Sequence, residues 1–159
     1  MPAVKILMLL VIANGAPIIA NRVLGKRLNQ PIDGGLVLKD GRALFGPTKT
    51  VRGIAASLLA TTIAAKTMGF SLAIGALIGS CAMLGDLLSS FVKRRLDVEP
   101  SGRALGLDQI PESLIPMLVL LIPLDLTVGD LVIVVGSFFV LELLLSRILH
   151  RIGVRDRPY

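Results

Sequence analysis

Apolar residues along this chain lie in long continuous blocks, separated by shorter polar segments that contain most of the charged residues. A helix needs roughly 20 consecutive apolar residues to cross a bilayer, whereas a helix of a soluble domain carries only an apolar stripe. The blocks therefore predict an all-α integral membrane protein with about five transmembrane helices, the second of which is the shortest. Their expected bounds are Ala3–Ala20, Gly53–Met68, Phe70–Val92, Ile110–Leu126 and Val128–Leu149.

Composition favours a membrane protein over a soluble domain. Of the 159 residues, 53% are apolar and 18% are charged, whereas a soluble domain typically has about 45–50% apolar and about 25% charged residues. No repeat, low-complexity tract or linker divides the chain, so we predict one transmembrane domain over residues 1–159. A cleaved signal peptide is an alternative for the first block, because residues 13–16 resemble a weak cleavage region, but four further blocks still require a membrane.

Single residues inside or beside the blocks exclude several chemistries. Cys81 is the one cysteine and His150 the one histidine. A disulfide, a thiolate-rich zinc site and a histidine-based catalytic triad therefore cannot form within one chain. Gly75 and Gly79 form a G-x-x-x-G pattern in the third block, which predicts close helix packing rather than a ligand-binding loop.

Basic residues are concentrated in three of the polar segments. Asn21–Arg52, Lys93–Gln109 and Arg147–Tyr159 hold 7, 4 and 4 of the 17 Lys and Arg residues. Because cytoplasmic segments of membrane proteins are enriched in Lys and Arg, we expect these three in the cytoplasm and the N-terminus outside. The same cations would be attracted to anionic headgroups, which by itself explains the net charge of +6.

The first basic segment carries turn signals around a short apolar run. Residues 36–38 read Leu-Val-Leu and lie between Asp33-Gly34-Gly35 and Asp40-Gly41. We therefore predict a small hairpin on the membrane surface. Thr48 or Thr50 is expected to cap the helix that forms the second span.

The third block ends in polar residues on one helical face. Asp86, Ser89, Ser90 and Lys93 lie at positions i, i+3, i+4 and i+7, followed by Arg94 and Arg95. One interpretation is a polar seam between helices that ends in interfacial anchors. A carboxylate inside an apolar span is costly, however, and usually marks a functional site.

Two further acids follow the second basic segment. Asp108 and Glu112 are four residues apart, so one face of a starting helix can present both, although acids there can also simply favour a helix N-terminus. Together with Asp86 they provide oxygen ligands suited to Mg²⁺, which typically binds one or two carboxylates plus substrate phosphates. The neighbouring Lys and Arg residues suit the remaining phosphate charge.

These residues resemble the signature of the CTP-dependent phosphatidate cytidylyltransferase superfamily. The resemblance lies in Gly85-Asp86-Leu87, Ser90-x-x-Lys93-Arg94, Ser101-Gly102 and Leu107-Asp108. The short archaeal branch, the CDP-archaeol synthases, is more similar still. The chain shares with that branch the Pro-x-Asp-Gly-Gly motif at 31–35 and the Asp-Gly-Arg…Phe-Gly-x-x-Lys-Thr-x-Arg-Gly loop at 40–53.

The resemblance implies a membrane-embedded reaction of CTP with an isoprenoid diether glycerol phosphate, which gives a CDP-activated lipid and pyrophosphate. It implies Mg²⁺ as cofactor and two cytoplasmic loops that form an interfacial active site, with no nucleic acid partner. The residues it assigns to catalysis are Asp86, Lys93 and Asp108, and those it assigns to the metal are Asp86, Asp108 and Glu112. The residues it assigns to substrate binding are Asp33, Lys49, Thr50, Arg52, Ser89, Ser90, Arg94, Arg95, Ser101 and Gly102.

The chain departs from the wider superfamily at three places. Glu99-Pro100 occupies the position of a Lys-Asp pair, Ala104-Leu105-Gly106 replaces a Gly-His-Gly-Gly element, and Glu112 lies one residue beyond the usual second aspartate. The metal role therefore transfers more directly to Asp86 and Asp108 than to Glu112.

Two other functions remain open on the residues alone. A phosphotransferase that consumes a CDP-lipid is one, although the closely spaced aspartates expected after Asp40-Gly41-Arg42-Ala43 are missing. A small transporter that uses Asp86 and Glu142 as intramembrane charges is the other.

Overall fold

The computed structural model describes residues 2–25, 27–98, 104–151 and 153, and its regular elements are five helices. The all-α prediction is confirmed, because the described residues form no strand beyond two isolated bridges, Pro31 with Thr50 and Val37 with Ala43. The helices are α1 (Pro2–Leu24), α2 (Val51–Thr67), α3 (Leu72–Arg95), α4 (Gln109–Leu120) and α5 (Val128–Arg151).

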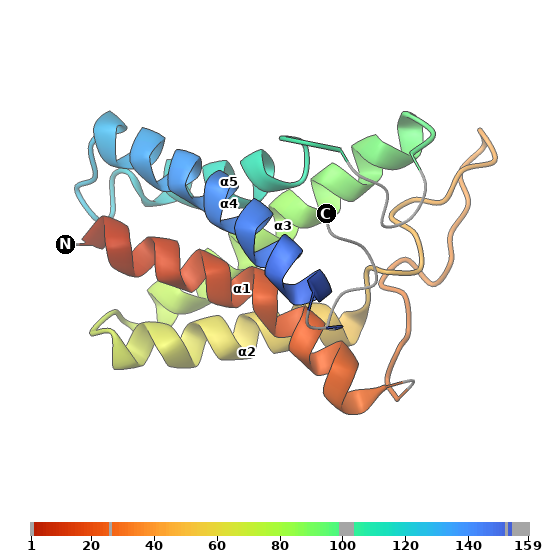
Figure 1. Cartoon of the computed structure of the whole chain (residues 1–159), viewed down its shortest axis with the longest axis horizontal. Coiled ribbons are helices and arrows are strands. Elements are labelled where there is room, and N and C mark those ends of the chain that lie inside the picture. Colours follow the sequence, from red (N-terminus) through yellow and green to blue (C-terminus); the bar gives the residue numbers. More distant parts are fainter. Residues whose placement is uncertain (1, 26, 99–103, 152, 154–159) are drawn as a thin grey trace.

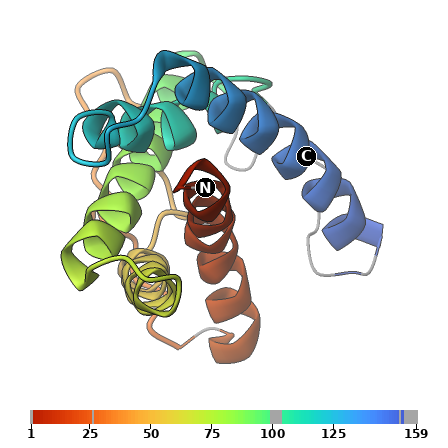
Figure 2. The ribbon, with the colours of Figure 1, turned by 90° about the vertical axis from the view of Figure 1, so that its left-hand side faces the viewer.

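The helices run along one long axis and change direction at each connection (Figure 1). Helices adjacent in the sequence pack against each other, and α1 also contacts α3 and α5. At one end of the bundle α1 ends, α2 begins, α3 ends and α4 begins, and we call this the loop end. Seen from the opposite end, α5 crosses the bundle obliquely, and its C-terminal part extends away from α2 and α3 (Figure 2).

Within the described residues, three helices are long and apolar enough to cross a membrane: α1, α3 and α5, with 23, 24 and 24 residues. The 17-residue α2 is slightly shorter, as expected. The fourth span differs from its predicted bounds of Ile110–Leu126, because α4 ends at Leu120 after only 12 residues. Pro123 explains this end: it has no N–H to donate and disfavours a helical conformation at the preceding residue.

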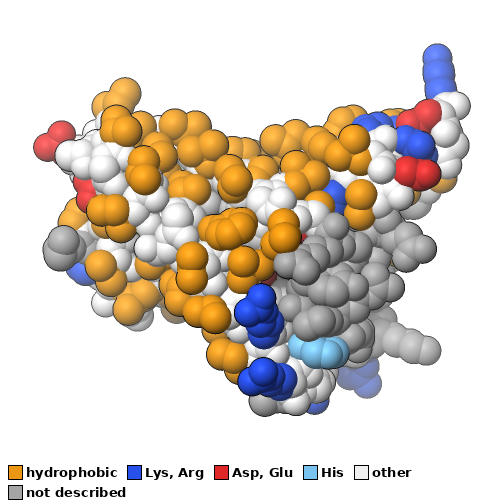
Figure 3. Space-filling view, turned by 45° about the horizontal axis from the view of Figure 1, so that its top comes forward, with side chains coloured by type: hydrophobic (Ala, Val, Ile, Leu, Met, Phe, Trp, Pro, Cys, Tyr) orange, Lys and Arg blue, Asp and Glu red, His pale blue; other side chains and the backbone are white. Residues whose placement is uncertain are grey.

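The surface has the character expected of a membrane protein. Apolar side chains cover most of one face along the bundle, whereas most of the visible Lys and Arg side chains gather toward the loop end (Figure 3). The small buried core lies between α1 and the helices around it. Its largest fully buried apolar side chains are Ile6, Leu9, Leu10, Ile78, Met117, Leu120, Val134 and Phe138.

Glycine brings α2 and α3 into backbone contact. A Cβ at Gly75 would lie 2.6 Å from the Cβ of Ala65 and 2.8 Å from the Cα of Thr62. A Cβ at Gly79 would lie 3.4 Å from Leu58, which is an ordinary contact distance. The predicted packing role of the G-x-x-x-G pattern is confirmed, and Gly75 is the position at which a larger residue would not fit.

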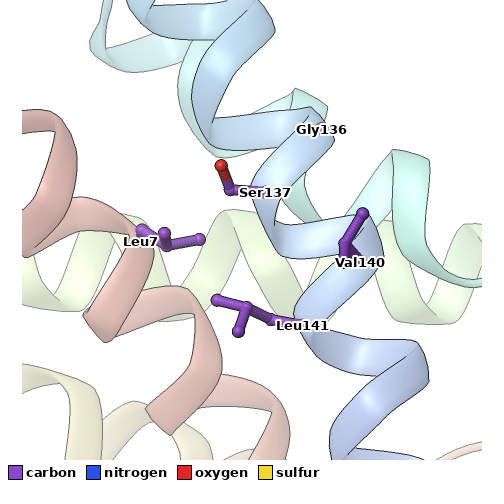
Figure 4. A pocket seen from close by; sticks show the side chains of 5 residues that line it. All are labelled: Leu7, Gly136, Ser137, Val140 and Leu141. Carbon is purple, nitrogen blue, oxygen red and sulfur yellow. The ribbon is translucent and has the colours of Figure 1, made fainter.

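A groove lies between the N-terminal part of α1 and the middle of α5. It has a volume of about 480 Å³ and is lined by Leu7, Gly136, Ser137, Val140 and Leu141. Leu7 and Leu141 point into the gap between the two helices, and Ser137 provides a hydroxyl there (Figure 4). The groove is therefore lined mostly by apolar side chains.

Candidate active site

The connection between α1 and α2 folds as a short hairpin. Leu38 N donates to Arg42 O and Leu44 N donates to Leu36 O, both at 2.9 Å. Gly41 closes the turn with φ +77°, a left-handed conformation that favours glycine. The hairpin predicted from the turn signals is confirmed over residues 36–44, which we call the hairpin below.

Asp33 fastens the base of the hairpin. Its carboxylate accepts hydrogen bonds from the backbone N–H groups of Gly35 at 3.0 Å, Phe45 at 2.9 Å and Gly46 at 3.2 Å. Partial burial raises the pKa of Asp33, but these N–H groups together lower it by more, so the pKa lies below its usual range. The carboxylate therefore shapes the loop, and its substrate-binding role stays a prediction.

Arg95, at the end of α3, binds the hairpin. Its guanidinium donates to Asp40 Oδ2 at 2.7 Å and to Ala43 O at 2.6 Å. Arg42 returns a hydrogen bond from the hairpin to Arg95 O. Two arginines thus fix the hairpin against the C-terminal turn of α3.

Thr50 and Arg52 fix the start of α2. Thr50 is the N-cap, and its hydroxyl accepts from Gly53 N at 3.1 Å, as one of the two predicted capping residues. The Arg52 guanidinium donates to Asn21 Oδ1 at 2.7 Å, Asn29 Oδ1 at 3.0 Å and backbone carbonyl oxygens at the end of α1. Arg52 is buried, and it holds the two ends of the loop together.

These contacts assign loop-holding roles that the sequence alone did not suggest. The family resemblance places Arg52 and Arg95 among the substrate-binding residues. A guanidinium offers five N–H donors in a planar fork and serves carbonyl oxygens as well as phosphates. The only signal available was the presence of Asn21, Asn29 and Asp40 nearby, and pairing them required the fold.

The predicted acids meet lysines at the loop end of the bundle. Lys49 Nζ lies 2.6 Å and 2.7 Å from the two carboxylate oxygens of Asp86. Lys93 Nζ lies 2.6 Å from Asp108 Oδ1. Burial lowers the pKa of Lys49, but the neighbouring carboxyl groups, with Asp86 first among them, together raise it by more, so the pKa of this ammonium lies above its usual range. Asp108 is the N-cap residue of α4 and makes no side-chain capping hydrogen bond there.

Gly85 allows α3 and α4 to bring two carboxyl groups together. A Cβ at this position would lie 2.4 Å from Pro111 O and 2.7 Å from Glu112 Cα, so the two backbones touch. As a result, the Asp86 and Glu112 carboxyl groups lie within hydrogen-bonding reach of each other. Sequence reasoning identified Gly85 as part of a motif and missed this packing role, which depends on a contact with a distant helix.

The polar face of α3 points into the protein. Ser89 is fully buried and donates to Gly85 O at 2.9 Å, and Ser90, Lys93 and Arg94 are buried as well. Glu142 of α5 is close enough to Glu112 for their carboxyl groups to interact electrostatically. Thus α5 contributes an acid to the same region. The predicted substrate-binding residues Ser101 and Gly102 lie outside the described residues.

A divalent cation fits part of this arrangement. Among the described residues, no group of three or more acidic, histidine or cysteine side chains has the arrangement of a metal site. Asp86 and Glu112 form a pair, whereas Asp108 is held by Lys93. Because Mg²⁺ usually takes one or two carboxylates and completes its shell with water and substrate phosphates, a pair of carboxylates is a sufficient protein contribution.

Comparison with known proteins identifies the family. The family model described as CDP-archaeol synthase (CarS-like) matches residues 4–159. The chain belongs to the CDP-archaeol synthase family. A CDP-archaeol synthase of Sulfurisphaera tokodaii is 34% identical over 155 residues, 93% of this chain and 89% of that protein. One of Hyperthermus butylicus is 43% identical over 104 residues, 62% of this chain and 59% of that protein.

A solved structure supports the same conclusion. It is described as an intramembrane enzyme for archaeal membrane lipids biosynthesis, and it matches this chain with a TM-score of 0.73 and 32% identity. The match covers 91% of this chain and 92% of the other. The resemblance drawn from the motifs is thereby confirmed, and the chain is a multi-pass membrane enzyme of the CTP-dependent nucleotidyltransferases. The transporter and CDP-lipid-consuming phosphotransferase alternatives are set aside.

Proposed function

We propose that this protein transfers the cytidylyl group of CTP to an isoprenoid diether glycerol phosphate and releases pyrophosphate. The observation that supports this most strongly is the Asp86–Glu112 carboxyl pair beside Lys49 at the loop end of a membrane bundle. One substrate carries two long apolar chains and the other is soluble in water. A site at the end of the bundle, bordered by polar loops, is accessible to both.

The chemistry needs alignment and charge neutralisation more than proton transfer. A lipid phosphate oxygen attacks the α-phosphorus of CTP, and the bond from that phosphorus to the oxygen bridging to the β-phosphorus breaks. Pyrophosphate leaves with the bonding electron pair. Because the nucleophile is already an anion, no general base is required, and positioning with electrostatic stabilisation lowers the barrier.

Different residues of the loop end would neutralise charge, hold the metal ion and keep the loops in place. Lys49 and Lys93 carry ammonium groups that can neutralise the phosphates, and Arg94 lies beside them on the buried face of α3. Asp86 and Glu112 would hold Mg²⁺, with Asp108 next to them. The bound ion would stabilise the charge on the phosphate oxygens and align them. Arg95, Arg52 and Asp33 keep the hairpin and the start of α2 in place around these groups.

The groove between α1 and α5 is our candidate site for one apolar chain of the lipid substrate. The apolar groove between α1 and α5 has room for part of an isoprenoid chain, since a volume of 480 Å³ is within the usual range of small-molecule sites.

The positive-inside rule favours a cytoplasmic location for the loop end, where CTP is made. We therefore assign the N-terminus to the outside and the active site to the cytoplasmic interface of the cell membrane.

The test is the fate of each phosphate label. Purified protein in liposomes is incubated with Mg²⁺, the diether glycerol phosphate and CTP labelled at either the α- or the γ-phosphorus, and the lipids are extracted. We expect the α-label in the lipid fraction and the γ-label only in aqueous pyrophosphate. Transfer of the γ-label to lipid would identify a kinase and contradict the proposal. Absence of both labels from the lipid, with a folded protein, would contradict it as well.

A further inference from the structure

The backbone around Lys49 is held on both sides, so that mainly its side chain is free to move. Lys49 O accepts from Ile32 N at 2.8 Å, and Lys49 N donates to Gly46 O at 3.3 Å. On the following side, Val51 N donates to Gln30 O at 3.1 Å, where α2 begins. The ammonium group is therefore carried on a flexible four-carbon chain that is anchored at a fixed point beside the acids.

That ammonium group occupies both oxygens of one carboxylate. Lys49 Nζ lies 2.6 Å and 2.7 Å from Asp86 Oδ1 and Oδ2, and the two side chains are only 22% and 20% exposed. A divalent cation bound by Asp86 would need at least one of the same oxygens. Two cations in this partly buried space would repel each other strongly, because the low effective dielectric screens charge poorly. Lys49 and a bound cation therefore cannot both keep a close contact with Asp86.

We propose that Lys49 competes with the divalent ion for Asp86 and moves to the triphosphate when the ion binds. The inference rests on the proposed function. Before substrates bind, the Lys49 ammonium group balances the charge of the Asp86 carboxylate, which lies beside the buried Glu112. Displacing Lys49 without nucleotide leaves its charge without a partner, whereas the phosphates of CTP supply one. Ion and nucleotide therefore favour each other's binding, and the coupling is reciprocal.

The experiment measures binding of Mn²⁺ alone, without nucleotide and without turnover. Free Mn²⁺ is quantified by electron paramagnetic resonance during titration of the wild type, Lys49→Met and the control Lys39→Met. Methionine keeps an unbranched side chain of similar length and removes the charge. Lys39 lies in the same loop and is exposed, so its substitution changes the net charge equally. We expect Lys49→Met to bind Mn²⁺ at least about tenfold more tightly than the wild type, and Lys39→Met to bind like the wild type.

Three results separate this inference from its rivals. Equal or weaker Mn²⁺ binding by folded Lys49→Met would overturn it, as would an equal gain in Lys39→Met, which would reveal a general charge effect. The gain should disappear in Lys49→Met/Asp86→Asn, and a gain that persisted there would place the competition elsewhere and refute it. Lys49→Gln repeats the comparison should the methionine variant be unstable. Failure of the label-transfer assay would refute the proposed function without changing any of these affinities.

Discussion

Replacing Gly85 with alanine tests whether the contact between α3 and α4 builds the site. The added Cβ would lie 2.4 Å from Pro111 O, 2.5 Å from Pro111 C and 2.7 Å from Glu112 Cα, whereas ordinary contacts begin near 3.4 Å. All three neighbours are backbone atoms, so no side chain can rotate away. Helix α4 must therefore shift by about 1 Å, and it carries Glu112 away from Asp86.

The expected cost is larger for activity than for folding. Overpacking of this kind costs about 1–3 kcal/mol of stability, and a better helix former recovers part of it. A displacement of about 1 Å between groups that must align with substrate costs about 100-fold in rate. We therefore expect Gly85→Ala to lose about two orders of magnitude in kcat while it still purifies as a folded protein.

The assay is steady-state formation of CDP-lipid in liposomes, combined with thermal unfolding in detergent. Gly15→Ala in α1 is the matched control, because a Cβ there meets nothing within 4 Å. The control should keep wild-type activity. If Gly85→Ala also kept a kcat within about twofold of the wild type, the close approach of the two helices would not position the acids, and our account of the site would be wrong.

Three further predictions concern the loop and the groove. Arg95→Lys loses the planar fork that holds the hairpin, so amide exchange over 36–44 should quicken and kcat/KM fall about tenfold; unchanged exchange would argue that Arg95 contacts only substrate. Gly136→Phe should raise the KM for the lipid several-fold and leave the KM for CTP unchanged, and an equal effect of Val132→Phe, at an exposed position of α5 that does not line the groove, would contradict a chain-binding groove. Because the folded pKa of Asp33 is depressed, its stabilisation of the loop is present above about pH 4 and is lost as the pH falls further. Loop exchange that rises already between pH 7 and pH 5 would contradict that role.

The sequence predicted the helices well where hydrophobicity alone determines them. The blocks at 3–20 and 128–149 correspond to α1 and α5, with ends extended by a few residues. It failed at the fourth span, because an apolar composition continues past Leu120 while Pro123 prevents the helix from doing so. Turn signals and capping preferences predicted the hairpin and the Thr50 cap, since both depend on neighbouring residues only.

The acidic residues of the site could be predicted from the sequence, whereas the residues that pair with them could not. Helical spacing and the positions of the two loops were enough to bring the acids of α3 and α4 to one end of the bundle. The pairing of Lys49 with Asp86 joins residues 37 positions apart, and it depends on how the loop folds back. The closeness of Asp86 to Glu112 depends on the backbone contact at Gly85. Such facts arise from packing between distant segments, and local sequence patterns do not contain them.

The most direct test of the central claim is the rate at which Asp86→Asn forms CDP-lipid at saturating Mg²⁺ and CTP. Asparagine keeps the size of the side chain and removes the negative charge that faces Lys49 and the ion. We predict a loss of about three orders of magnitude or more in kcat, with the thermal unfolding temperature of the variant close to that of the wild type. A folded Asp86→Asn protein that retained more than about one tenth of wild-type activity would contradict the assignment of Asp86 to the centre of the reaction.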